Sequence, residues 1–179
     1  MFTYSYGGKA VVNMNLYKEI RHAIKNFENN KVKLLIGQDK EVLNTMTTFG
    51  TWLHVAAKHG NLEICKHLVE EGIDINTKGG TFDASALNLA AGAGDLEFVK
   101  YLIHSGAELD ESLAKRNPLF GAIYGGHKDI VELLVESGID ISKRYAGESL
   151  KNMNAYQYAR EFGQTDIAEY LRQKMDGKK

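Results

Sequence analysis

A repeated glycine pattern is the feature that most constrains the fold of this 179-residue chain. Gly60, Gly94, Gly126 and Gly163 follow one another at intervals of 34, 32 and 37 residues. Another glycine comes twelve residues after each of the first three, at Gly72, Gly106 and Gly138. Around these glycines the segments 51–76, 85–110 and 117–142 align with one another, and 154–174 aligns as a degraded fourth copy. A period of this length predicts a solenoid of stacked units.

Each unit is predicted to be a pair of short helices. A residue whose side chain can cap a helix begins each first helix, at Thr51, Ser85, Asn117 and Asn154. Pro118 then occupies a first helical position, where its missing N–H costs nothing. The first glycine of each unit is expected to end this helix in a left-handed conformation. The second helices carry apolar residues at helical spacing, such as Ile64, Cys65, Leu68 and Val69.

The motif itself resembles that of the ankyrin-repeat family. The family pattern T-P-L-H-x-A-A is present as the run from Thr51 to Ala57, and Asn117-Pro118-Leu119-Phe120 repeats its beginning. Trp52 and Ala86 stand where proline is usual, and Asn88 and Phe120 where histidine is usual. The resemblance covers residues 48 to 174. It implies an all-α ankyrin-repeat solenoid of helix-turn-helix pairs with extended turns.

The chain is expected to divide along this pattern. Residues 1–13 are interpreted as a flexible leader, and Met14 stands where the helical pattern begins. Residues 14–47 lack the motif but are amphipathic, so they are predicted to form a helical N-terminal cap over the apolar end of the stack. Three repeats then follow at 48–76, 77–110 and 111–142. Residues 143–175 are expected to be a degenerate C-terminal capping repeat.

The sequence offers no arrangement that indicates catalysis. Six histidines are present, but none has acidic or cysteine partners at metal-ligand spacing, so no metal and no cofactor are expected. His54 is expected to tie the turn to its neighbour, as in the family motif. The single cysteine, Cys65, fits a buried apolar position, and its isolation suits a reducing, cytoplasmic compartment. With no apolar run near the ~20 residues that span a bilayer, no membrane role is predicted.

The remaining candidate for function is a protein-binding surface. Ankyrin proteins usually meet a partner through a concave face, formed by the extended turns and the exposed side of each first helix. Carried over by position, this implies contact residues that are mostly aromatic or charged: Phe49, Trp52, Lys58, His59, Phe82, Asp83, Arg116, Tyr124, Glu161 and Phe162. For Trp52 and Phe162, packing within the chain is an equally good explanation. Small Gly92, Ala93 and Gly125 are expected to leave a hollow on this face.

Charge suggests which partner could be attracted. Residues 48–142 contain 7 Lys and Arg against 14 Asp and Glu, a balance of −7 within a chain of net charge −1. Several of these carboxylates lie in or beside the turns, where they could steer a basic partner: Asp74, Asp83, Glu108, Asp110, Glu111 and Asp140. The charge gives no indication of direct nucleic-acid binding.

Two segments narrow the expected function further. The third repeat, from Arg116 to Tyr145, and the following GESLKNMNAYQYAREFGQTDIAEYL resemble small bacterial ankyrin proteins that serve as immunity proteins in polymorphic-toxin and contact-dependent growth inhibition systems. This resemblance implies a monomer that binds a cognate toxin, often a basic nuclease domain, in a 1:1 complex and occludes its active site in the cytoplasm. The alternative is a general ankyrin scaffold or regulatory adaptor for a cellular protein.

Overall fold

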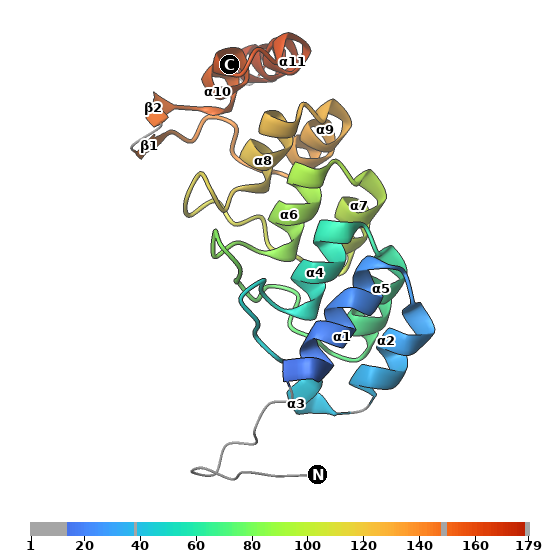
Figure 1. Ribbon diagram of the computed structural model, residues 1–179. Helices are drawn as coiled ribbons and strands as arrows, with labels where there is room; N and C mark the ends of the chain where they lie inside the picture. Colours follow the sequence, from blue (N-terminus) through green and yellow to red (C-terminus); the bar gives the residue numbers. More distant parts are fainter. Residues whose placement is uncertain (1–13, 38, 148–149, 178–179) are drawn as a thin grey trace.

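The computed structural model describes residues 14–37, 39–147 and 150–177, and the expected leader at 1–13 lies outside these residues. Within the described ranges the chain forms eleven helices and one small two-stranded hairpin. The helices are stacked in pairs from one end of the molecule to the other (Figure 1). The predicted all-α ankyrin solenoid is therefore confirmed.

The helix pairs build two parallel rows. The first helices form one row: α1 (Met14–Lys25), α4 (Trp52–His59), α6 (Ala86–Ala93), α8 (Pro118–Gly125) and α10 (Ala155–Glu161). The second helices form the other row: α2 (Asn29–Ile36), α5 (Leu62–Glu70), α7 (Leu96–His104), α9 (Lys128–Glu136) and α11 (Thr165–Asp176). The short helix α3 (Lys40–Leu43) lies between the first and second pairs. Each helix of the first row packs against the next one in that row.

Local chemistry sets the helix ends as the sequence predicts. Thr51, Ser85, Asn117 and Asn154 all precede first helices with extended backbone, and the last three accept a hydrogen bond from an N–H of the following turn. At the other ends, Gly60, Gly94 and Gly126 have φ of +66°, +82° and +74°. This left-handed backbone suits glycine because it has no Cβ.

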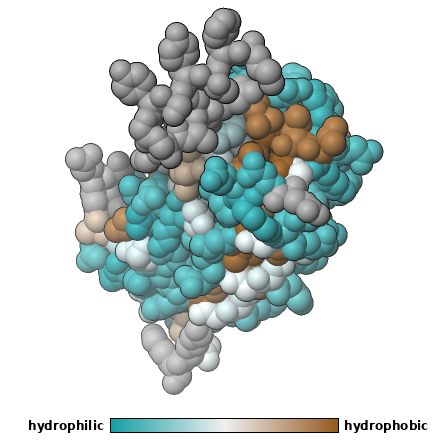
Figure 2. Space-filling view, turned by 90° about the horizontal axis from the view of Figure 1, so that it is seen from below, coloured by the Kyte–Doolittle hydropathy of each residue, from teal (hydrophilic) through white to brown (hydrophobic). Residues whose placement is uncertain are grey.

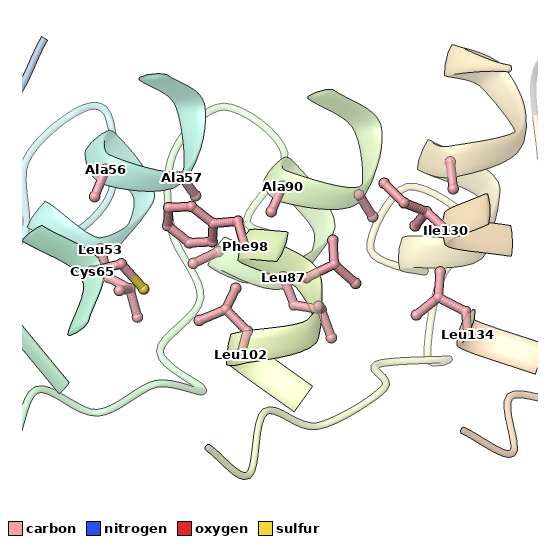
Figure 3. Close-up of a cluster of buried hydrophobic side chains, with 14 of the residues drawn as sticks. Leu53, Ala56, Ala57, Cys65, Leu87, Ala90, Phe98, Leu102, Ile130 and Leu134 are labelled. Atoms are coloured by element: carbon pink, nitrogen blue, oxygen red, sulfur yellow. The ribbon is translucent and has the colours of Figure 1, made fainter. Parts of the chain in front are cut away.

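The core is a continuous apolar layer between the two rows. In Figure 3, Phe98 of α7 lies between Ala57 of α4 and Ala90 of α6, beside Leu102. Cys65 lies at one end of the cluster drawn, and Ile130 and Leu134 lie at the other. All of these side chains are fully buried. Small residues in the first row and large residues in the second keep the rows close, and burial of each large side chain contributes about 2 kcal/mol.

Helices α6 and α8 approach each other especially closely. Gly92 and Gly121 face one another, so that a Cβ built on Gly121 would lie 3.5 Å from the Gly92 Cα and 3.4 Å from the Asn88 carbonyl oxygen. A methyl group at either position would therefore be in van der Waals contact with the facing helix.

The segment expected to be an N-terminal cap has the shape of a repeat. Helices α1 and α2 pair as α4 and α5 do, and the Glu28 N–H donates to the Ala23 carbonyl just as the Asn61 N–H donates to that of Ala56. Phe27, 33 residues before Gly60, adopts φ of +58° although it is not glycine. The side chain of Phe27 is 55% exposed, so it lies outside the core.

The last turn differs from the others because it contains a hairpin. Strands β1 (Tyr145–Gly147) and β2 (Leu150–Met153) pair antiparallel ahead of α10. The buried Tyr145 ties this hairpin to the preceding repeat, because its hydroxyl donates to the Glu111 carbonyl and accepts from the Asn117 amide. The sequence patterns did not predict these strands.

Candidate protein-binding surface

We use the name first-helix face for the exposed sides of α1, α4, α6, α8 and α10 together with the turns that precede them. Large apolar side chains on this face remain open to solvent: Phe49 (46% exposed), Phe82 (57%), Tyr124 (65%) and Phe162 (44%). All four are among the predicted contact residues. Surface-exposed aromatic groups of this kind are typical of protein interfaces.

The predicted residues Phe49, Lys58 and His59 come together at the N-terminal end of this face. They line a groove of about 670 Å³ between α1 and α4. Helix α1 supplies the opposite wall through Asn15, Lys18, Glu19, Arg21, His22 and Lys25. We call this hollow the basic groove. Burial, followed by the charges of Lys58, Lys25 and Arg21, lowers the pKa of His59.

An apolar hollow adjoins the basic groove. It has a volume of about 590 Å³ and is lined largely by Met14, Tyr17, Met46, Phe49 and Trp52. Lys18, Arg21 and Phe49 line both hollows, so the two share a wall. The whole N-terminal end of the molecule, seen in Figure 2, carries patches of hydrophobic surface among hydrophilic side chains.

The middle of the face is organised by an ion pair between neighbouring turns. The Arg116 guanidinium donates to the Asp83 carboxylate and, through Nε at 2.8 Å, to the Asp83 carbonyl oxygen. Asp83 itself has a left-handed φ of +49°. Phe82 stands beside this pair with its ring exposed. The three predicted residues therefore form one local group.

Aromatic rings form a ladder at the C-terminal end of the face. Tyr145 contacts Phe120 at 5.0 Å between ring centroids, Phe120 contacts Tyr158 at 4.7 Å, and Tyr158 contacts Phe162 at 4.5 Å. Phe162 then meets Tyr124 edge-on at 5.2 Å. The ladder runs from buried Tyr145 to exposed Tyr124. The inner rings thus hold the outer two in place, which reduces the entropy that a partner would have to remove.

Glu161, another predicted contact, is exposed at the end of α10. It lines a small hollow of about 290 Å³ with Met153, Gln157 and Arg160. This hollow contains none of the other predicted contact residues.

Packing within the chain accounts for Trp52, although the residue also borders the apolar hollow. Its side chain is 0% exposed, and its Nε1–H donates to the Val42 carbonyl at 2.7 Å. Its ring also packs edge-on against Tyr17 at 5.6 Å. The indole thus packs between the first two helix pairs, where its N–H donates a hydrogen bond to a backbone carbonyl.

His54 has the structural role that the motif predicted. Its Nδ1 accepts from the Thr51 N–H at 3.2 Å, and its Nε2 lies 2.8 Å from the Ala84 carbonyl oxygen, one repeat further along. A carbonyl can only accept, so Nε2 carries the proton and the ring is neutral. Burial lowers the pKa of His54 despite the bond to Ala84. Cys65 is likewise structural, because burial raises the pKa of its thiol to about 12.

Several carboxylates expected to steer a basic partner are engaged within the turns instead. Asp74, Asp110 and Asp140 each accept the N–H of the residue two positions later. Asp110 also pairs with Lys78 at 2.7 Å, and Asp83 pairs with Arg116. Burial opposes ionisation of Asp110, but hydrogen bonds from Lys78 and Ser112 outweigh it and lower its pKa to about 2. These carboxylates shape the turns, which weakens the sequence argument for a basic partner.

The hollow expected beside Gly125 is filled. A Cβ on Gly125 would lie 2.4 Å from Nε2 of His127, and one on Gly94 would lie 2.4 Å from Cε1 of the same ring. The ring also hydrogen-bonds the Gly92 carbonyl oxygen at 3.2 Å. Small residues here therefore make room for His127 and not for a ligand.

Sequence reasoning missed the contribution of α1 to the first-helix face. Interpreting residues 14–47 as a cap left Lys18, Arg21, His22 and Lys25 without a role. A signal was available in their spacing, because residues three and four positions apart lie on one side of a helix. Tyr158 was missed as well, since its contacts with Phe120 and Phe162 depend on how α10 packs against α8.

The described residues contain neither a metal-ion site nor a membrane-spanning helix. Across residues 14–37, 39–147 and 150–177, no three His, Cys, Asp or Glu side chains converge as a metal-ion site would require. No helix in those ranges combines the length and apolarity needed to cross a bilayer.

Stacked helix pairs with an exposed, partly aromatic face define the class of helical-repeat proteins that bind other proteins. The sequence model for ankyrin repeats (3 copies) matches residues 20–112 and 87–179. The chain therefore belongs to the ankyrin-repeat family, and ankyrin repeats serve as protein-interaction modules. This match begins within the segment that lacks the motif, in agreement with the repeat-like α1–α2 pair. No curated protein sequence matches the chain.

Proposed function

We propose that this protein is an immunity protein that binds a cognate bacterial toxin domain through its first-helix face and blocks the toxin by covering its active site. The observation that carries this proposal is the set of exposed aromatic side chains along that face, above all Tyr124 and Phe162. They are held by neighbouring rings and offer a preformed contact. Aromatic residues held in this way are frequent among those that dominate binding energy.

The sequence supports the same proposal independently. The third repeat and the segment after it resemble bacterial ankyrin immunity proteins, and the aromatic ladder is built from those two regions. We therefore expect a 1:1 complex, formed in the cytoplasm, between a monomer of this chain and one toxin domain. A nuclease is the toxin class that the resemblance favours.

Co-expression with the product of the adjacent gene tests this function. We expect a stoichiometric complex in which the toxic activity is lost, with nuclease activity assayed first. Replacing both Tyr124 and Phe162 with alanine should weaken the complex at least tenfold, because each ring buries a large apolar area on binding. Leu34→Ala is the matched control, since Leu34 is 81% exposed but lies on α2. A bound toxin that stays fully active would refute neutralisation and leave the broader role of an interaction scaffold.

A further inference from the structure

We propose that the basic groove and the apolar hollow beside it together bind an acidic segment of a partner protein that also carries one or two large apolar side chains. The first observation is a set of cations without acidic partners. Lys18, Arg21, Lys25 and Lys58 all line the groove. None of the four forms an ion pair within the part of the chain that the structure describes.

The one carboxylate in the groove wall does not neutralise this charge. Glu19 pairs with Lys31 at 3.0 Å, and Lys31 is not among the residues that line the groove. The lowered pKa of His59 has burial as its largest cause and the cations Lys58, Lys25 and Arg21 as the next ones. The groove therefore has a positive potential that a bound carboxylate would relieve.

The apolar hollow gives the ligand its second property. The ring of Phe49 lies between the two hollows, with the Arg21 guanidinium 4.3 Å from its centroid. Met14 and Met46, which are 66% and 51% exposed, line the apolar side together with Tyr17. Methionine side chains adapt to ligands of different shape. A segment with carboxylates followed by an aromatic or aliphatic residue would satisfy both hollows.

Charge elsewhere favours a polypeptide over a nucleic acid. Beyond the groove, residues 60–142 contain 6 Lys and Arg against 14 Asp and Glu, a balance of −8. A nucleic acid extending from the groove along the turns of the first-helix face would meet Asp74, Glu108 and Glu111, whereas a short acidic segment would not. The preceding segment of the chain is not a fitting occupant either, because residues 1–13 contain no Asp or Glu.

A synthetic probe tests the proposal without a toxin. The probe is a 12-residue peptide of glutamates interrupted by one phenylalanine and one leucine, added to the ¹⁵N-labelled full chain and followed by NMR. We expect saturable shifts in α1 and around Phe49, and affinity that falls at least tenfold between low and high salt. The same peptide with lysine in place of every glutamate should not bind.

Charge reversal in the groove is the decisive comparison. Lys25→Glu combined with Lys58→Glu should weaken the peptide at least tenfold, and the corresponding glutamine pair should have an intermediate effect. Lys100→Glu combined with Lys128→Glu changes the net charge equally on second helices and should leave the affinity within twofold. Equal weakening by both reversals, no binding of the acidic peptide, or tighter binding of a 12-residue oligothymidylate would overturn the proposal.

This inference deepens the proposed function, and the two can fail separately. A toxin complex that forms normally with the groove reversal, although the acidic peptide no longer binds, would show that the groove serves a different partner. Loss of peptide binding only in the groove variants would support the groove even if no toxin were ever neutralised.

Discussion

Protonation of His54 should destabilise the fold, and the structure allows this effect to be isolated. In the folded protein Nδ1 accepts from the Thr51 N–H while Nε2 donates to the Ala84 carbonyl. A second proton on Nδ1 would end the bond from the Thr51 N–H and leave the Thr51 hydroxyl, at 2.8 Å, as the partner of Nδ1. Burial adds to this cost, so the pKa of His54 lies below its ordinary value of 6.5.

The lowered pKa of His54 decides the direction in which stability changes with pH. Above pH 6.5 the ring is neutral in both states, and its contribution to folding is fully present. As the pH falls below 6.5 the unfolded chain takes up a proton that the folded chain resists, so the free energy of unfolding decreases until the folded pKa is reached. In this window the decrease approaches about 1.4 kcal/mol per pH unit.

His54→Asn is the informative substitution because Asn88 occupies the same position one repeat later. Loss of the bond to Ala84 should cost about 1–3 kcal/mol at pH 7.5. Urea unfolding at pH 7.5, 6.5, 6.0 and 5.5, followed by fluorescence of Trp52, the single tryptophan, gives the stability of both proteins. We expect a shallower decline with falling pH in the variant than in the parent.

His59 needs its own control because its pKa is lowered as well, by burial and by neighbouring cations. His59→Gln should remove a smaller part of the pH dependence, since His59 is partly exposed whereas His54 is 1% exposed. Parallel stability curves for His54→Asn and the parent between pH 6.5 and 5.5 would refute the assignment of a neutral, buried imidazole.

Two further perturbations probe other contacts. Gly94→Ala and Gly106→Ala both place a Cβ on left-handed backbone, at φ of +82° and +89°, so each should lower the free energy of unfolding by about 1–2 kcal/mol. Gly94→Ala should cost about 1 kcal/mol more in urea denaturation, because only its Cβ meets the ring of His127. Equal costs would contradict that contact. Asp110, whose pKa is about 2, contributes stability above its ordinary pKa of 3.8 that is lost as the pH falls toward 2. Asp110→Asn should therefore lower the free energy of unfolding by about 1–2 kcal/mol at pH 6, a value that allows for the partial exposure of Lys78. The loss should be much smaller at pH 2, and acid titration followed by circular dichroism measures it.

Features decided by one short stretch of sequence could be predicted. The caps at Thr51, Ser85 and Asn117 and the left-handed glycines follow from backbone chemistry within a few residues. Trp52 could not be placed because its position is decided by the space between two helix pairs. Its indole replaces the usual proline, and only the packed structure shows that Tyr17 and the Val42 carbonyl receive it.

Contacts between repeats were predictable in principle but required pairing residues one period apart. Asp83 and Arg116 are 33 residues apart, and Glu111 and Tyr145 are 34 apart. In a solenoid this separation brings equivalent turns into contact, so a search at the repeat period would have paired them. The hairpin at 145–153 had a weaker guide, since the other paired turns among the described residues contain only single antiparallel bridges, Thr47 with Gly50 and Gly79 with Ala84.

The basic groove and the aromatic ladder lie at opposite ends of the stack, and the units between them pack chiefly against their neighbours along the row. Such a molecule can fray from either end without disturbing the other, because the stability of the array is a sum over adjacent units. A partner that contacts both ends would prevent this independent fraying. It would couple the two terminal units, so that neither could open until the complex had come apart.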